Sequence, residues 1–241
     1  MRTIVRISLL VAVLISSAGV IMSADNQDVK ETPQKGIASV LVQPELIINP
    51  EKTAVLIMDY ENDILGMIPD NERTSLVERA NMVLKEAWRA KHRIIYVVVR
   101  FRKGYPEVNP QNKLFSSLTD SGRLLEGTIG AEIDPKVAPK PGDIVVTKSR
   151  VGAFSTTDLE TILRSNNISR LVLFGISTSG VVLSTVRWAA DMDYSLVVVS
   201  DLCADRDPEV NRVLMEKVFP RQATVVTSKE FLKSIGVKDV R

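Results

Sequence analysis

Two residues of opposite charge stand where two apolar segments of the chain end. Asp59 follows the apolar run 53–58, and Lys148 follows the segment 143–147. Short apolar runs are typical of strands buried in a parallel sheet, and the carboxyl ends of parallel strands lie at one edge of that sheet. We therefore expect both side chains at the same edge. A carboxylate and an ammonium group placed there either hold each other charged or share a proton in acid/base chemistry.

A turn of small residues is the third feature of this edge. The apolar run 171–174 is followed by the turn 175–180, which is built of glycine, serine, threonine and isoleucine, and a helical pattern begins at Val181. The first turn of a helix has free N–H groups and the positive end of the helix dipole, so ligands bind at such strand–turn–helix junctions. The turn therefore locates a binding site without specifying its chemistry.

Strands and helices alternate along the chain. Apolar, often β-branched runs predict six strands, at 53–58, 94–99, 143–147, 171–174, 196–199 and 223–226. Helical patterns predict helices between them, at 72–91, 157–166, 181–189, 208–218 and 228–235. This alternation favours a three-layer α/β/α sandwich with a six-stranded, mostly parallel, Rossmann-like sheet. The long irregular segment 101–141 follows a strand's carboxyl end, so we expect it to cover the site as a lid.

The beginning of the chain has a different composition. Residues 1–24 carry two arginines, then an apolar run, then small residues, which is the pattern of a secretory signal peptide; an uncleaved N-terminal anchor is the alternative. We therefore expect export to the periplasm or the exterior, with membrane contact only if this segment is retained. The polar residues 25–40 predict a flexible lead-in, and residues 41–241 predict one domain.

Charge and composition argue against several classes of function. The 241 residues have a net charge of +2, which Arg2 and Arg6 supply, so no basic field indicates a nucleic-acid partner. His92 is the only histidine and Cys203 the only cysteine. Any Ser-His-Asp or Cys-His mechanism would need His92, and no ligand set for structural or histidine-based catalytic zinc exists. A lone cysteine in an exported protein is usually buried, so we expect Cys203 to be inert.

Four segments in order resemble the isochorismatase-like hydrolase superfamily, which includes nicotinamidases and N-carbamoyl amidases. They read VLIMDYEND at 55–63, VTKSRVGAF at 146–154, GIST at 175–178 and VSDLCAD at 199–205. The resemblance covers roughly residues 45–230 and implies a six-stranded parallel sheet, with an active site where the aspartate and lysine described above flank the turn.

The resemblance also implies a special geometry for the turn. Family members commonly have a non-proline cis peptide there, which in this chain would join Ile176 and Ser177. Such a bond would aim N–H groups into the pocket as an oxyanion hole. We expect Thr178, Gly180 and Val181 to complete that hole with Ser177.

One position departs from the amidase members of the family. Their nucleophilic cysteine stands six residues after the first glycine of the turn, where this chain has Val181, and Cys203 lies 22 residues later. The resemblance therefore does not supply a thiol mechanism at the usual place. Glu61 stands where many members have glutamine. The metal-binding histidines of nicotinamidases have no counterpart here, so we expect no metal, and we expect no cofactor.

Our leading hypothesis is a hydrolase of a small-molecule substrate that has no cysteine nucleophile. True isochorismatases, a subgroup of the family, cleave a vinyl ether with the aspartate as general acid, although glycine is usual where this chain has valine. In this scheme Asp59 is the acid/base and Lys148 its electrostatic partner, while Arg100, Arg150 and Phe154 shape the pocket. A non-catalytic small-molecule-binding protein and an amidase with a serine or threonine nucleophile are the alternatives. We also expect a homo-oligomer, which is common in the family.

Overall fold

Six apolar segments form one parallel sheet. The computed structural model describes residues 46–238, and within them six strands pair in the order β3-β2-β1-β4-β5-β6, every neighbouring pair parallel. The strands are β1 Thr53–Met58, β2 Arg93–Val99, β3 Ile144–Lys148, β4 Arg170–Gly175, β5 Ser195–Val199 and β6 Thr224–Val226. The predicted sheet is confirmed. The predicted signal peptide at 1–24 and lead-in at 25–40 lie outside the described residues.

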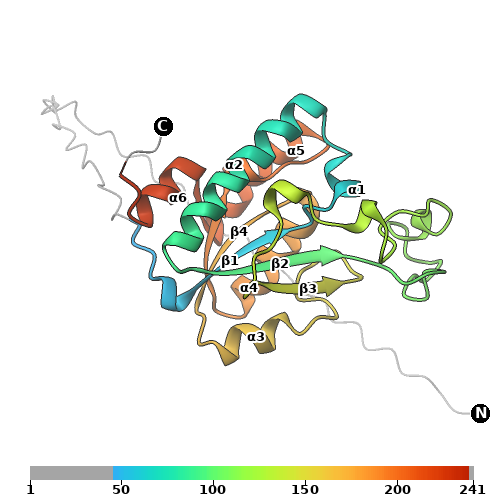
Figure 1. The fold of residues 1–241 in the computed structure, drawn as a ribbon, viewed down its shortest axis with the longest axis horizontal. Coiled ribbons are helices and arrows are strands. Elements are labelled where there is room, and N and C mark those ends of the chain that lie inside the picture. Colours follow the sequence, from blue (N-terminus) through green and yellow to red (C-terminus); the bar gives the residue numbers. More distant parts are fainter. Residues whose placement is uncertain (1–45, 239–241) are drawn as a thin grey trace, which may run out of the picture. The chain divides into compact units, whose positions relative to one another are not determined.

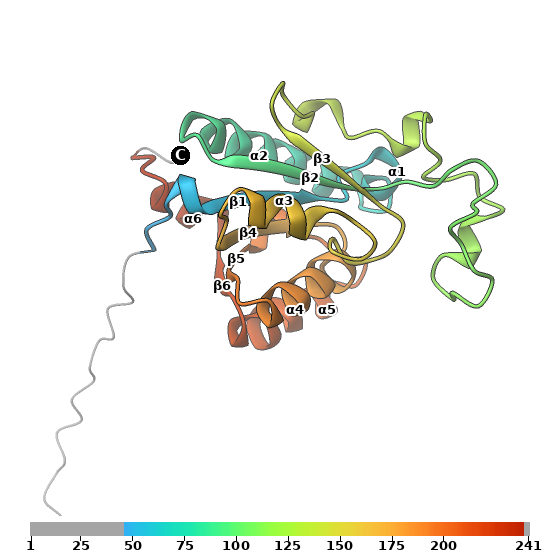
Figure 2. The same ribbon diagram turned by 90° about the horizontal axis from the view of Figure 1, so that it is seen from below.

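Helices cover both faces of this sheet. They are α1 Asn62–Leu65, α2 Asp70–Arg89, α3 Leu159–Ser165, α4 Leu183–Asp191, α5 Pro208–Val213 and α6 Ser228–Ser234 (Figure 1). Figure 2 shows α2 on one side of the sheet and α4 and α5 on the other, which is the expected three-layer sandwich. The short helix α1 was not predicted, because four residues are too few to show helical periodicity.

The strand register brings the ends of the central strands together. β1 is buried along its whole length, as its uninterrupted apolar sequence predicts. Met58, its last residue, pairs with Val97 of β2 and Gly175 of β4, and Val99 at the end of β2 pairs with Lys148 of β3. Residues that follow these strands must therefore leave the sheet at one edge, which is where the binding site was expected.

The helix after β4 begins earlier than predicted. Residues Thr178–Val182 form a π-helical turn that continues directly into α4, so the connecting turn is shorter than 175–180. Wider helical turns of this kind often occur at functional sites. The segment 101–141 contains only single turns of 3-10 helix, at Ser116–Leu118, Ile129–Ala131 and Pro135–Val137. Among residues 46–238, no helix has the length and apolar character to cross a membrane.

Candidate active site

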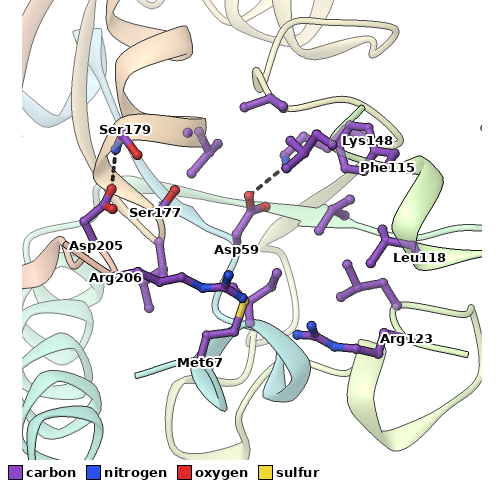
Figure 3. Close-up of a pocket in the computed structure, with 18 of the residues that line it drawn as sticks. Asp59, Met67, Phe115, Leu118, Arg123, Lys148, Ser177, Ser179, Asp205 and Arg206 are labelled. Atoms are coloured by element: carbon purple, nitrogen blue, oxygen red, sulfur yellow. Dashed lines mark hydrogen bonds and ion pairs between the residues drawn. The ribbon is translucent and has the colours of Figure 1, made fainter. Parts of the chain in front are cut away.

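Asp59 and Lys148 form a buried ion pair at the carboxyl edge of the sheet. Lys148 Nζ donates to Asp59 Oδ2 at 2.8 Å, and the two side chains are 1% and 8% exposed (Figure 3). Asp59 has a φ of 58°, in the left-handed region that non-glycine residues seldom adopt, and its amide donates to Val97 O at 2.8 Å. The backbone therefore bends sharply at Asp59, directly after β1, and the carboxylate lies at this edge of the sheet.

Burial controls the protonation of Asp59. Loss of water raises the pKa of this carboxyl from 3.8 to about 6, and the charge and hydrogen bond of Lys148 oppose that rise. Its second oxygen, Oδ1, is buried and has no hydrogen-bond partner among the described residues. A carboxyl group with such a pKa can be either donor or acceptor of a proton near neutral pH.

The turn after β4 has the expected cis peptide bond between Ile176 and Ser177. Some of its amides are already occupied: Thr178 N donates to Ala204 O at 2.9 Å, and Ser179 N donates to a carboxylate oxygen of Asp205 at 2.7 Å. The Gly180 amide donates back to Ser177 O at 3.2 Å. The expectation that the Thr178 and Gly180 amides bind an anion is therefore corrected, because both already have acceptors.

Ser177 and Val181 supply two further amides of the turn. No described acceptor outside the π-helical turn bonds either N–H group, and both residues line the pocket. An N–H group at a pocket wall can bind a developing negative charge. The turn thus has fewer N–H groups available for an anion than the sequence indicated.

A cavity of about 350 Å³ opens over the ion pair. One wall is formed by the segment that was expected to cover the site, through Leu114, Phe115, Ser117, Leu118, Arg123 and Leu124. Much of the remaining wall is apolar, with Ile64, Met67, Ile68, Val99, Val151, Ile176 and Val181. No cysteine or histidine is among the described residues that line it, and Val181 is 1% exposed. The pocket therefore suits a small molecule with a largely apolar body.

Two arginines give this pocket a positive side that the sequence did not reveal. Arg123 and Arg206 both line it, and no described carboxylate pairs with either of them. In Figure 3 their guanidinium groups extend toward one another and lie below Asp59 in this view. Arg206 lies a few residues after the end of β5, so its position after a strand could have indicated that it lies at this edge. Arg123 lies in the long irregular segment, where no local pattern marks it.

The three side chains that we expected to shape the pocket are not among the residues that line it. Arg100 Nε donates to Ala131 O at 3.0 Å, so it braces the segment after β2. Arg150 donates to the carbonyl of Ser149, and Phe154 stacks on Trp188 with ring centroids 6.3 Å apart. This expectation is corrected, because position near a strand end does not fix the direction of a long side chain.

The lone cysteine and the lone histidine, Cys203 and His92, do not line this pocket. Cys203 is buried as expected, and burial raises the pKa of its thiol to about 12. Burial also lowers the pKa of His92 to about 4, so that its imidazole is neutral. Among residues 46–238, no group of three or more His, Cys, Asp and Glu side chains is arranged to hold a metal ion.

The fold is a three-layer α/β/α sandwich with an acid–lysine pair beside a strand–helix turn, and comparison with known proteins identifies the family. Residues 53–230 match the isochorismatase domain, so the chain belongs to the isochorismatase family of hydrolases. It is 30% identical to the isochorismatase family protein YwoC of Bacillus subtilis, over 79% of this chain and 97% of that protein.

Two further relatives show the breadth of the family. Ureidoacrylate amidohydrolase RutB of Rhizobium rhizogenes is 28% identical, over 87% of this chain and 91% of that protein. The crystal structure of a cysteine hydrolase from Pseudomonas syringae superposes with a TM-score of 0.71 at 22% identity, covering 78% of this chain and 94% of the other. The last likeness concerns the fold alone.

Proposed function

We propose that the protein hydrolyses a small organic molecule with Asp59 as general acid and without a covalent enzyme intermediate. The observation that carries this proposal is the buried Asp59–Lys148 pair, which faces a cavity whose described lining contains neither thiol nor imidazole. Acid-assisted cleavage, such as vinyl-ether hydrolysis, needs a proton donor and a water molecule rather than a nucleophilic side chain.

The proton balance of this reaction can be written with the residues present. Asp59 in its protonated form gives its proton to the substrate, and the carboxylate that remains is stabilised by Lys148 at 2.8 Å. Water then adds to the cationic carbon. One of its protons returns to Asp59, and the other passes to the departing oxygen as the carbon–oxygen bond breaks, which leaves a carbonyl compound and an alcohol. The amides of Ser177 and Val181, two residues that line the pocket, bind negative charge on the substrate or on the departing oxygen.

The charges of the pocket indicate the substrate class. Its walls carry Arg123 and Arg206 beside the neutralised Asp59–Lys148 pair, while Asp205 is held by the Ser179 amide. A guanidinium group without a protein carboxylate is suited to bind a carboxylate or phosphate. We therefore propose a substrate with an apolar body and at least one anionic group.

A non-catalytic small-molecule-binding protein is the second candidate. It is favoured by Val181, which lines the pocket at the position where the amidase members have cysteine. An amidase with a serine or threonine nucleophile has less support. The Thr178 hydroxyl donates to Asn211 at 2.6 Å, and no described hydroxyl of the turn is hydrogen-bonded to Asp59 or Lys148.

The test is a substrate panel with matched variants. Purified protein is incubated with isochorismate and a set of small anionic amides and vinyl ethers, and products are followed by chromatography. We expect turnover that Asp59→Asn lowers by about 10²–10⁴ and that Lys148→Ala also lowers. Thermal stabilisation by a panel compound that is never consumed would support the binding protein instead. Equal rates in wild type and Asp59→Asn would reject the proposed role of the carboxylate.

A further inference from the structure

A second carboxyl group lies buried beside the acid–lysine pair. Glu61 is 0% exposed, does not line the pocket, and accepts a hydrogen bond at Oε1 from Val99 N at 2.5 Å. Its other oxygen, Oε2, is buried and has no partner among the described residues, and the same is true of Asp59 Oδ1. The two carboxyl groups thus each have one oxygen that the rest of the described structure leaves without a donor.

The charges of this cluster do not balance if both acids are ionised. Asp59 and Glu61 would then carry two negative charges, and Lys148 is the cation that acts on both. The neighbouring ionisable groups do not help, because Arg100 and Glu132 pair with each other at 3.3 Å. A net negative charge without access to water is costly, and two close carboxylates avoid it by retaining one proton.

The hydrogen bonds indicate which acid keeps that proton. Asp59 has the direct bond to Lys148, which favours its charged form. Glu61 lacks such a bond, and burial followed by the nearby charge of Asp59 raises its pKa well above the usual range. A neutral glutamic acid has one O–H donor and one carbonyl acceptor, which is the hydrogen-bonding capacity of a glutamine.

We propose that Glu61 is a proton-holding positioning residue, whose carboxyl group stays protonated at neutral pH and donates its O–H to the unpartnered oxygen Oδ1 of Asp59. Its Oε1 keeps the Val99 amide as donor, and its proton fixes the orientation of the Asp59 carboxyl against Lys148. The assignment of Asp59 as a general acid rests on the proposed function. The protonation of Glu61 does not.

The direct test is infrared spectroscopy of the intact protein. At pH 8, where Asp59 with its pKa of about 6 is ionised, we expect a carboxylic-acid carbonyl band in the wild type. Glu61→Gln should remove the band. Glu126→Gln, at an exposed glutamate, is the matched control and should leave the band unchanged. Absence of the band in the wild type, or its persistence in Glu61→Gln, would overturn the proposal.

A second measurement follows unfolding by denaturant as a function of pH. A carboxyl whose pKa is raised in the folded state binds more protons there than in the unfolded chain, so stability falls as pH rises above its ordinary value of 4.5. Asp59 contributes the same sign, but only up to about pH 6. His92, whose pKa burial lowers, contributes the opposite sign up to about pH 6.5, and the Cys203 thiol titrates near pH 9 in the unfolded chain. Between about pH 7 and 8 the decline therefore belongs to Glu61, and Glu61→Gln should flatten it. Glu61→Ala, which leaves Val99 N and Asp59 Oδ1 without partners, should lower the unfolding midpoint at every pH.

These results separate the inference from the proposed function. Neither measurement needs a substrate, so a protonated Glu61 in a protein without turnover would uphold the inference and reject the hydrolase. Equal pH slopes for wild type and Glu61→Gln between about pH 7 and 8 would reject the inference while leaving the hydrolase intact. With an active substrate, the pH dependence of kcat/KM adds a third readout. Glu61→Gln replaces one neutral donor with another and should leave the pH at which Asp59 loses its proton nearly unchanged, whereas a clear fall of that pH in the variant would mean that Glu61 is ionised and would overturn the inference.

Discussion

The ion pair at the carboxyl edge of the sheet and the ion pairs of Arg212 on helix α5 have nearly the same lengths but opposite surroundings. Lys148 and Asp59 are 2.8 Å apart with side chains 1% and 8% exposed. Arg212 lies 2.7 Å from Glu209 on the same helix and 2.6 Å from Glu216 in the helical turn that follows, and all three side chains are 49–66% exposed. Distance therefore does not distinguish a surface pair from a buried one.

The two regions differ in the access of solvent to the charged groups. On α5, water screens the charges and hydrates either partner if the other is lost, so the pairs contribute little. At the sheet edge, neither partner can be rehydrated, so each charge depends on the other. The same loss of water raises the pKa of Asp59, whereas the pKa of Glu209 is lowered by its hydrogen bond to Arg212. Burial thus creates the acid that the proposed reaction needs.

The largest expected effect is the loss of Lys148. Lys148→Met keeps much of the side chain's length but leaves Asp59 buried without a cation, and we expect a loss of about 3–5 kcal/mol in the free energy of unfolding. The double variant with Asp59→Asn should recover part of that loss, because removing both charges leaves neither unpaired. Denaturant unfolding at pH 7 measures both. A loss below about 1 kcal/mol, the size typical of surface pairs, would mean that the buried pair contributes no more to stability than the ion pairs of α5.

The next effect concerns the pH dependence of turnover. Asp59 must carry a proton to act as a general acid, and its pKa is about 6. We expect kcat/KM to be level below about pH 6 and to fall about tenfold per unit above it. Glu209→Gln is the control and should leave this profile unchanged. A rate that rises through pH 6 would show that Asp59 works as a base instead.

A smaller effect is expected at the mouth of the pocket. Arg206→Ala removes a guanidinium group that we propose to bind the substrate's anion, so KM for an anionic substrate should rise about tenfold, or about 1.4 kcal/mol, with little change in kcat. Arg212→Ala, which removes an arginine already paired with carboxylates, is the matched control. A change of equal size in both variants would mean that overall charge, rather than the position of Arg206, governs binding.

The smallest effect is expected on α5 itself. Glu209→Gln removes one partner of Arg212, which keeps its contact with Glu216 at 2.6 Å. We expect the melting temperature to change by no more than about 2 °C, and less in high salt. Calorimetry at low and high ionic strength measures this. A shift as large as that of Lys148→Met would contradict the argument that solvent separates the two regions.

Local patterns were sufficient to predict the fold and the central pair. The run that ends before Asp59 is a fully buried central strand, as its continuous apolar sequence predicts, whereas β3, which ends at Lys148, is an edge strand in which only Val146 and Lys148 are buried. Because all the strands are parallel, their carboxyl ends lie at one edge of the sheet, whatever the conformation of the loops. The early start of the helix at Thr178 was missed, because small and hydroxylated residues suit a turn as well as a helical start.

The wall of the pocket was not predictable from local patterns. Arg100 and Phe154 follow strands as Asp59 does, yet one braces a neighbouring segment and the other stacks on Trp188. A long side chain at a strand end has several rotamers, and non-local packing selects among them. Arg123 reaches the pocket only because the segment 101–141 returns across it, with the Phe101 amide bonded to Leu124 O at 2.9 Å.

The sequence by itself determined where the candidate site lies, since that depends on strand direction and burial, which the alternation of apolar runs and helical segments encodes. It also showed that Val181 stands in place of a cysteine. Only the tertiary structure decided that Glu61 shares the buried space of Asp59, and that two distant arginines face one cavity. The physical reason is that protonation and binding depend on groups brought together in three dimensions, where the loss of water makes each charge depend on its neighbours.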